Sequence, residues 1–235
     1  MYKRQVDSKT SIGRQIISLN SDEIQTITTE WKGIQTWDCE NPNLYTLKLE
    51  LINPQKQIVH IHEERIGFRT IEFRPKDGIY VNGTKIIVKG TNRHSFHPDG
   101  GRTTNRELSL QDALLIKEMN MNAVRSHYPP DKHFLEICDS LGIFYLNELA
   151  GWQNSYDTET GLKLLSEMIN RDVNHPCIFM WSNGNEGGWN KNIDAHFADY
   201  DPQKRHVIHP WADFNGLDTH HYPACLLYTS PSPRD

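Results

Sequence analysis

The chain has 235 residues, of which 37% are hydrophobic and 23% charged, a length that suits one large domain or two smaller ones. Its formal net charge of −5, without a basic stripe, argues against a nucleic-acid surface and fits an uncharged ligand better. No stretch approaches the roughly 18 apolar residues that a membrane span needs, and the N-terminal region lacks the apolar core of a secretory signal. We therefore expect neither nucleic acid nor a membrane as a partner.

The cysteines give no sign of a disulfide framework or a zinc site. They lack CxxC and metal-ligand spacing, so free thiols are predicted at Cys39, Cys138, Cys177 and Cys225. They assign no compartment, and both the bacterial cytoplasm and the periplasm stay open.

Both ends of the chain fit the coding of a single DNA element. Residues 225–235 can be encoded by a sequence that resembles a widely used transposon sequencing adaptor, and residues 1–5 by the reverse complement of its opening bases, with GTG as the start codon. We expect both segments to be adaptor-derived and leave them out of the fold prediction. The alternative is an ordinary flexible tail rich in Ser and Pro.

Residues 12–74 show the short, alternating runs of an antiparallel β-sandwich. Apolar and polar residues alternate along 45–52, and the Asn53-Pro54 pair ends that strand. The run 57–64 is its expected hairpin partner, and 67–73 is a further expected strand.

After Pro75 the pattern changes to alternating strands and helices. Strands are expected at 85–89, 122–125, 143–146, 177–181, 207–208 and 217–220, and helices at 109–120, 134–141, 161–174 and 192–200. Ser109 is the expected N-cap of the first helix, and Gly142 is the expected C-cap of the second. Such alternation predicts parallel strands joined by right-handed crossovers, in a barrel or an open doubly wound sheet.

Polar residues at the strand ends favour the barrel. Each expected strand is followed by side chains that a core would reject, namely Asn92, Arg93, His94, Arg125, Ser126, His127, Asn147, Glu148, Asn183, Asn185, Glu186, His209, His220 and His221. Polar groups at the same end of every strand are typical of the catalytic face of a (β/α)₈ barrel. An open sheet would gather them at one switch point beside a glycine-rich loop, and neither GxGxxG nor GxxxxGK[ST] occurs.

Six segments then carry a family resemblance. They are 40–45 (ENPNLY), 67–69 (GFR), 90–97 (GTNRHSFH), 122–129 (NAVRSHYP), 138–142 (CDSLG) and 181–187 (WSNGNEG). In order and spacing they resemble the β-galactosidases of glycoside hydrolase family 2, over nearly all of residues 35–224. The resemblance implies a multidomain β and α/β fold. Residues 6–75 would be the C-terminal part of an immunoglobulin-like β-sandwich, and residues 76–224 an incomplete TIM barrel with strands 1–6 only.

The resemblance also implies a reaction. Retaining glycosidases use two carboxyls about 5–5.5 Å apart, one to protonate the leaving oxygen and one to attack the anomeric carbon. Glu186 matches the acid/base of the family, and Asn185 the asparagine that binds the sugar 2-hydroxyl. The nucleophile normally closes strand 7, so we expect it to be absent from this chain and the chain itself to be inactive. The expected partner is a carbohydrate, and a homo-oligomer stays open for the full-length enzyme.

Five further positions match residues around the family's site. Arg125 matches the arginine that orients the nucleophile and favours its ionised form, and Glu148 matches a strand-end carboxylate that orders the site. His94 and His127 match histidines of the sugar pocket. Tyr222 matches a tyrosine that contacts the nucleophile.

One departure concerns the cofactor. Magnesium-binding β-galactosidases have a glutamate and a histidine shortly after the carboxylate that Glu148 matches, where this chain reads Leu149-Ala-Gly-Trp-Gln-Asn154. We therefore expect no cofactor, magnesium included. Trp152, Trp189 and Trp211 are each either a sugar-stacking platform or ordinary packing.

Several functions stay open at this point. Hydrolysis of terminal β-galactosides leads, with β-glucuronidase and β-mannosidase as alternatives within the family. A non-catalytic carbohydrate-binding barrel is an alternative of another class, although it would have no need of both Glu186 and Arg125. A metal-dependent hydrolase would use His94, His97, His127 and His220, but such barrels usually have His-x-His on the first strand.

Overall fold

A computed structural model of the chain describes residues 12–18 and 26–219. Within these ranges, no helix is both long and apolar enough to cross a membrane. The two segments predicted to be adaptor-derived, 1–5 and 225–235, lie outside the described residues.

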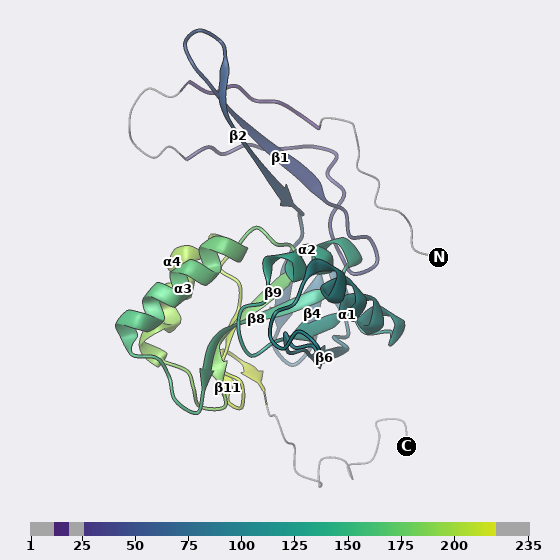
Figure 1. The fold of residues 1–235 in the computed structure, drawn as a ribbon, viewed down its shortest axis with the longest axis vertical. Helices are drawn as coiled ribbons and strands as arrows, with labels where there is room; N and C mark the ends of the chain where they lie inside the picture. The colour runs from purple at the N-terminus through teal and green to yellow at the C-terminus, as the bar shows by residue number, and fades with distance from the viewer. Residues whose placement is uncertain (1–11, 19–25, 220–235) are drawn as a thin grey trace.

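A long β-hairpin rises away from the rest of the molecule (Figure 1). It pairs β1 (Tyr45–Ile52) with β2 (Ile58–Ile66) in antiparallel register, which confirms the predicted hairpin. Leu47, Leu49 and Leu51 alternate along β1 and are 39–50% exposed. An apolar stripe on one face of the hairpin therefore lies in solvent in the described part of the chain.

A small antiparallel sheet follows the hairpin. It joins β3 (Ile71–Arg74), β4 (Gly78–Val81) and β5 (Thr84–Ile86), so its strand pairing crosses the predicted domain boundary at residue 75. Asn82 and Gly83 both have positive φ, 51° and 78°, as a tight hairpin turn between β4 and β5 requires. Of the strand predicted at 85–89, only residues 85–86 are strand, and they belong to β5 of this sheet. Residues 87–89 form no strand.

A parallel sheet forms the described part of the barrel. Its strands are β6 (Gly90–Asn92), β7 (Ala123–Arg125), β8 (Phe144–Trp152), β9 (Ile178–Asn185) and β10 (Val207–Ile208). They lie side by side in chain order, and every neighbouring pair is parallel. An open doubly wound sheet would reverse its order at a switch point. The sheet therefore confirms a partial TIM barrel.

The predicted sixth strand does not join this sheet in the described part of the chain. Its first residues form β12 (Leu217–Asp218), which pairs antiparallel with β11 (Asp213–Phe214). The parallel sheet thus has five strands within the described residues, and the end predicted at His220 lies outside them.

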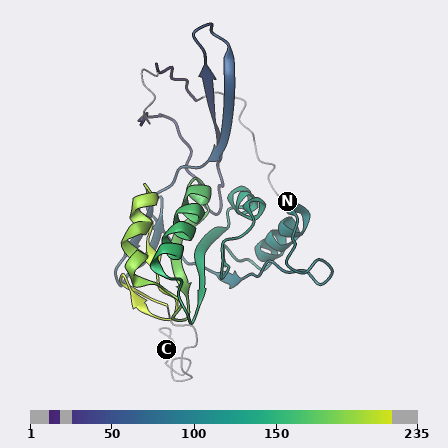
Figure 2. The same cartoon turned by 60° about the vertical axis from the view of Figure 1, so that its left-hand side comes forward.

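Helices follow the strands on one side of the sheet (Figure 2). They are α1 (Arg106–Glu118), α2 (Lys132–Leu141), α3 (Thr158–Asp172), the 3₁₀ helix η1 (Lys191–His196) and α4 (Phe197–Tyr200). Gly142 caps α2 in the left-handed conformation, as predicted. The predicted cap Ser109 is wrong. The side chain of Asn105 accepts from the Leu108 amide at 2.9 Å, and Ser109 is buried inside α1.

The core lies between the sheet and its helices. All eight residues of β9 are buried, as the apolar run 177–181 predicted for a strand covered on both faces. At the amino ends of the parallel strands, the segments flanking the hairpin close the core. Trp37 is fully buried and donates to the Asp139 carbonyl at 2.8 Å, while Arg69 Nε donates to the Pro176 carbonyl at 2.6 Å.

Candidate active site

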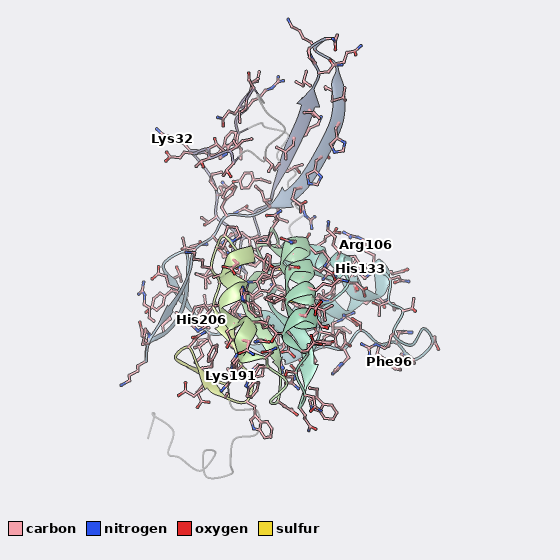
Figure 3. The ribbon with its side chains drawn as sticks, turned by 90° about the vertical axis from the view of Figure 1, so that its left-hand side faces the viewer. Lys32, Phe96, Arg106, His133, Lys191 and His206 are labelled. Atoms are coloured by element: carbon pink, nitrogen blue, oxygen red, sulfur yellow. The ribbon has the colours of Figure 1, made fainter. Side chains whose placement is uncertain are left out.

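The candidate site lies at the carboxyl ends of the parallel strands. Figure 3 labels Phe96, after β6, and Lys191, after β9, at the end of the molecule away from the hairpin. This is the end at which TIM barrels carry their active sites. The polar residues at these strand ends are therefore the candidate site residues.

Two of those residues turn away from the site. Asn147 precedes Glu148 in β8, and adjacent strand residues point to opposite faces. Asn147 Nδ2 donates to Asp172 Oδ2 in α3 at 2.8 Å, and Arg93 Nε donates to Asp112 Oδ2 in α1 at 2.8 Å. Both side chains fix helices to the sheet.

Three neighbouring strands bring Arg125, Glu148 and Asn185 together. Arg125 donates from Nε and Nη2 to Glu148 Oε2 at 2.9 and 2.7 Å, and from Nη2 to Asn185 Oδ1 at 2.7 Å. Glu148 has no exposed side-chain surface, whereas Arg125 keeps 14%. The described structure gives Arg125 two partners, Glu148 and Asn185, and its predicted role of orienting the nucleophile stays a prediction.

The pKa of the Glu148 carboxyl lies well above its ordinary value of 4.5. Burial raises the pKa of its carboxyl to about 7, even though the Arg125 guanidinium lowers it. The negative charge of Glu186 adds a smaller upward push. A carboxyl of this kind changes its charge near neutral pH.

Glu186 lies on a strained turn directly after β9. Its φ is 45°, between Gly184 at 76° and Gly187 at 90°. Residues other than glycine rarely adopt positive φ, and such strain persists where the surroundings enforce it. The surroundings include a close backbone contact between the end of β8 and the loop after β9, because a Cβ on Gly151 would lie 2.5 Å from the carbonyl oxygen of Gly188.

Trp152 fixes the Glu186 side chain. Its indole Nε1 donates to Glu186 Oε2 at 2.9 Å, and the Trp152 residue is 64% exposed. Sequence reasoning offered Trp152 only as a platform or as packing. The pairing of Trp152 with Asn185 across β8 and β9 creates the contact, and no local sequence signal encodes it.

His94 and His127 form a stacked pair beside this cluster. Their ring centroids are 4.9 Å apart, with planes 9° from parallel. His94 Nδ1 lies 3.2 Å from the Tyr128 hydroxyl, whose oxygen accepts from the Ser95 amide at 3.0 Å. The two predicted pocket histidines are thus brought together from β6 and β7.

The remaining predictions at this end have mixed outcomes. Trp189 stacks on the buried His209, and His209 Nε2 contacts Asp194 Oδ1 at 2.7 Å. Asp194 also accepts from Asn183 Nδ2 at 2.8 Å, so Trp189 belongs to packing that holds the loop after Glu186. Trp211 stays 51% exposed.

Three predicted residues lie outside the described part of the chain, namely Tyr222, His220 and His221. Within residues 12–18 and 26–219, no three His, Cys, Asp or Glu side chains come together in a way that could hold a metal ion.

Comparison with known proteins identifies the family. The sequence profile described as "Glycosyl hydrolases family 2, TIM barrel domain" matches residues 72–209, which is more than half of the chain. The chain belongs to glycosyl hydrolase family 2. A second profile, "Glycosyl hydrolases family 2", matches residues 2–69, so the family covers both the N-terminal β part and the partial barrel.

Individual relatives agree with this assignment. A β-galactosidase of Thermoanaerobacterium thermosulfurigenes is 38% identical over 185 residues, which are 74% of this chain and 25% of that protein. A putative β-glucuronidase of Formosa agariphila is 37% identical over 163 residues, or 67% and 20% of the two chains. The chain thus spans about a quarter or less of the length of these relatives.

Solved structures of glycosidases share the fold. A β-glycosidase from Bacteroides vulgatus superimposes with a TM-score of 0.69 and 31% identity, over 76% of this chain and 25% of that one. A Bifidobacterium dentium β-glucuronidase, complexed with coumarin-3-O-glucuronide, gives a TM-score of 0.70 and 28% identity over 75% and 32% of the two chains.

Proposed function

We propose that this chain contributes the acid/base half of a retaining β-glycosidase that removes terminal β-linked sugars, with β-galactosides as the leading substrates. The observation that carries the proposal is the placement of Glu186, whose carboxyl is held by Trp152 on a strained turn at the carboxyl end of β9. Glu186 is only half-buried, so a substrate can reach it. Strain at a half-exposed carboxyl is typical of functional sites.

Asn185 would bind the sugar next to Glu186. Its Oδ1 accepts from Arg125 at 2.7 Å, which fixes how the amide is turned. The Nδ2 group is then the end left to donate to a sugar hydroxyl. A donor fixed in advance costs little reorganisation when charge develops on the sugar, and a bond to the 2-hydroxyl strengthens in the transition state. His94 and His127 would line the same pocket.

Glu148 does not suit the role of nucleophile. A nucleophilic carboxylate must be ionised and must reach the anomeric carbon. Glu148 has no exposed side-chain surface, and burial raises its pKa to about 7. We therefore assign Glu148 to the positioning of Arg125 and Asn185, and propose that the nucleophile comes from outside the described residues.

A panel of substrates decides which sugar the protein removes. One relative is named a β-galactosidase, whereas another and a solved neighbour are named β-glucuronidases. Aryl β-galactoside, β-glucuronide and β-mannoside should be compared on the complete protein that contains this chain. A β-galactoside preference of at least about tenfold in kcat/KM supports the leading assignment.

The role of Glu186 is tested by Glu186→Ala in the complete protein. A dinitrophenolate leaving group needs no proton, but water still needs a base, so an activated aryl glycoside should form the glycosyl-enzyme and then stall. Azide needs no deprotonation and should restore turnover, releasing the β-glycosyl azide. Activity on a poor leaving group should fall by about 10³-fold or more.

Two results would remove Glu186 from this role. One is the absence of azide rescue, and the other is an α-azide as product, because retention requires two inversions. A protein that binds sugars but forms no glycosyl-enzyme, even with Glu186 intact, would instead support the non-catalytic barrel.

A further inference from the structure

The hydroxyl of Tyr128 joins the His94 ring to the backbone of the next residue. Its oxygen lies 3.2 Å from His94 Nδ1 and accepts from the Ser95 amide at 3.0 Å. His94 is exposed after the carboxyl end of β6, whereas Ser95 is buried. One phenol oxygen therefore links the imidazole of a predicted pocket residue to a fixed part of the chain.

The loop that carries Tyr128 is held in place without help from this hydroxyl. Ser126 Oγ donates to the Tyr128 carbonyl at 2.6 Å and also contacts the hydroxyl of the fully buried Tyr145. Pro129 follows and restricts the Tyr128 backbone to extended conformations. The Arg102 guanidinium lies 4.7 Å from the centroid of the Tyr128 ring. The phenol is thus positioned before any ligand binds.

The hydrogens at the Tyr128 oxygen assign the tautomer of His94. A phenol has one proton to donate, and the Ser95 amide already occupies one of its lone pairs. Across residues 12–18 and 26–219, the acceptor that the structure offers this proton is His94 Nδ1. A neutral imidazole whose Nδ1 accepts carries its hydrogen on Nε2. With the hydrogen on Nδ1 instead, the phenol would accept twice and its own proton would lose this acceptor.

The stack with His127 fixes the plane of the same ring. The two ring centroids are 4.9 Å apart, and the planes are 9° from parallel. A ring whose plane and one nitrogen are both held has its other nitrogen fixed in direction. Nε2 of His94 is therefore a donor with a defined direction.

We propose that Tyr128 is a positioning residue that keeps His94 in the Nε2–H tautomer, so that His94 donates to a hydroxyl of the bound sugar. This inference rests on the proposed function, because it places His94 in the sugar pocket. Without its hydrogen, Nε2 could bind a hydroxyl only by accepting that hydroxyl's proton. A donor fixed in advance costs little reorganisation on the way to the transition state.

Tyr128→Phe in the complete protein tests the role, because it keeps the ring beside Arg102 and removes only the hydroxyl. kcat/KM is measured on an aryl glycoside of the preferred sugar and on its 3-, 4- and 6-deoxy analogues. His94→Ala identifies the hydroxyl that His94 binds, since its effect shrinks on the analogue that lacks this hydroxyl. Tyr128→Phe should lower kcat/KM by about tenfold on the parent glycoside and by about threefold or less on that same analogue.

Tyr80→Phe is the matched control. Tyr80 lies on β4, has the Arg74 guanidinium 3.6 Å from its ring centroid and donates through its hydroxyl to Asp77 Oδ2 at 2.8 Å. It shares an arginine contact and a bonded hydroxyl with Tyr128 but belongs to the small antiparallel sheet. Removing its hydroxyl should leave kcat/KM within about twofold on all four glycosides.

Two further variants test the tautomer without changing Tyr128. The amide nitrogen of glutamine can take the place of Nε2 and that of asparagine the place of Nδ1, and neither amide has a second tautomer. His94→Gln should therefore keep kcat/KM on the parent glycoside within about tenfold of the wild-type value, whereas His94→Asn should lose about a hundredfold. In the His94→Gln background, Tyr128→Phe should lower kcat/KM by about twofold or less.

Four results would overturn the inference. They are wild-type kcat/KM in Tyr128→Phe, equal losses on all four glycosides in that variant, no hydroxyl-specific effect in His94→Ala, and a His94→Asn variant at least as active as His94→Gln. If Tyr128→Phe does not fold, the last comparison decides. Failure of the proposed function looks different, because the wild-type protein would then hydrolyse none of the four glycosides and Glu186→Ala would show no azide rescue.

Discussion

Arg125 reaches only one oxygen of Glu148 with both of its facing donors. Nε and Nη2 lie 2.9 and 2.7 Å from Oε2, while the buried Oε1 accepts no well-formed hydrogen bond among the described residues. An ionised carboxylate with one buried and poorly satisfied oxygen is costly. This arrangement explains why burial outweighs the guanidinium in raising the pKa of Glu148 to about 7.

The raised pKa of Glu148 makes folding stability depend on pH. Between its ordinary value of 4.5 and about 7, the folded state holds a proton that the unfolded state has released, so stability falls as the pH rises through this window. The fall amounts to at most about 3 kcal/mol. Glu148→Gln does not titrate and should lose this slope. Urea midpoints at pH 5 and pH 8 measure it, with the exposed Glu118→Gln as control. An unchanged slope in Glu148→Gln would contradict the assignment.

The bond from Arg125 to Asn185 predicts a coupling to the sugar 2-hydroxyl. Arg125→Lys loses the planar fork, so Asn185 is no longer held, and kcat/KM on an ordinary aryl glycoside should fall by about a hundredfold. On the 2-deoxy glycoside of the same sugar, the fall should be about tenfold or less, because the contact is already missing. Arg106→Lys, on the exposed face of α1, serves as control. Equal losses on both substrates would separate Arg125 from the 2-hydroxyl.

The backbone contact between the end of β8 and the loop after β9 predicts opposite effects of alanine at two glycines. Gly151→Ala places a methyl 2.5 Å from the Gly188 carbonyl oxygen and should displace the turn that carries Glu186. Turnover should drop by about a hundredfold, since small misplacements of catalytic groups are costly. Gly161→Ala, inside α3, meets only ordinary contacts from 3.4 Å and should stabilise the protein by about 0.5–1 kcal/mol without loss of activity. Comparable activities of the two variants would rule out the contact as a support for Glu186.

The apolar face of the hairpin predicts self-association of the 235-residue chain. Leu47, Leu49 and Leu51 are each more than a third exposed on a hairpin that has two strands within the described residues, where both of its edges offer backbone groups for pairing. Changing all three to Thr keeps the β-propensity and should shift the chain towards monomer in sedimentation velocity. The matched control changes Leu110 and Leu115, exposed on α1, to Thr. If the control variant dissociates as well, the hairpin is not the contact surface.

Periodic patterns in the sequence predicted most of the fold. The alternation along Tyr45–Ile52 predicted a strand, and the apolar run before Asn183 predicted a strand covered on both faces. The burial of one face of Tyr45–Ile52, which such alternation also predicts, is not found within the described residues. Element ends were less accessible. Asn105 and Ser109 are both good N-cap residues, and the burial of Ser109 against the core decided between them.

The position of the candidate site could be predicted from the sequence, but the hydrogen bonds between its side chains could not. Position at the strand ends brought Glu186, Asn185 and Glu148 to one end of the sheet. The partner of Arg125 was not predictable, because it depends on which of Asn147 and Glu148 faces inward. The bond between Trp152 and Glu186 was not predictable either, because it accompanies a close approach of the end of β8 to Gly188 that leaves no room for a side chain at Gly151.

The contacts of Trp37 and Arg69 with the barrel bear on how members of this family can exchange parts. Both residues precede the barrel in the chain, yet their donors bind carbonyls of Asp139 and Pro176 inside it. A chimera joined near residue 70 would pair a foreign tryptophan and arginine with these carbonyls. Recombination at that point should therefore succeed best between parents that place the end of α2 and the loop before β9 alike, whereas a junction before Trp37 keeps both contacts within one parent.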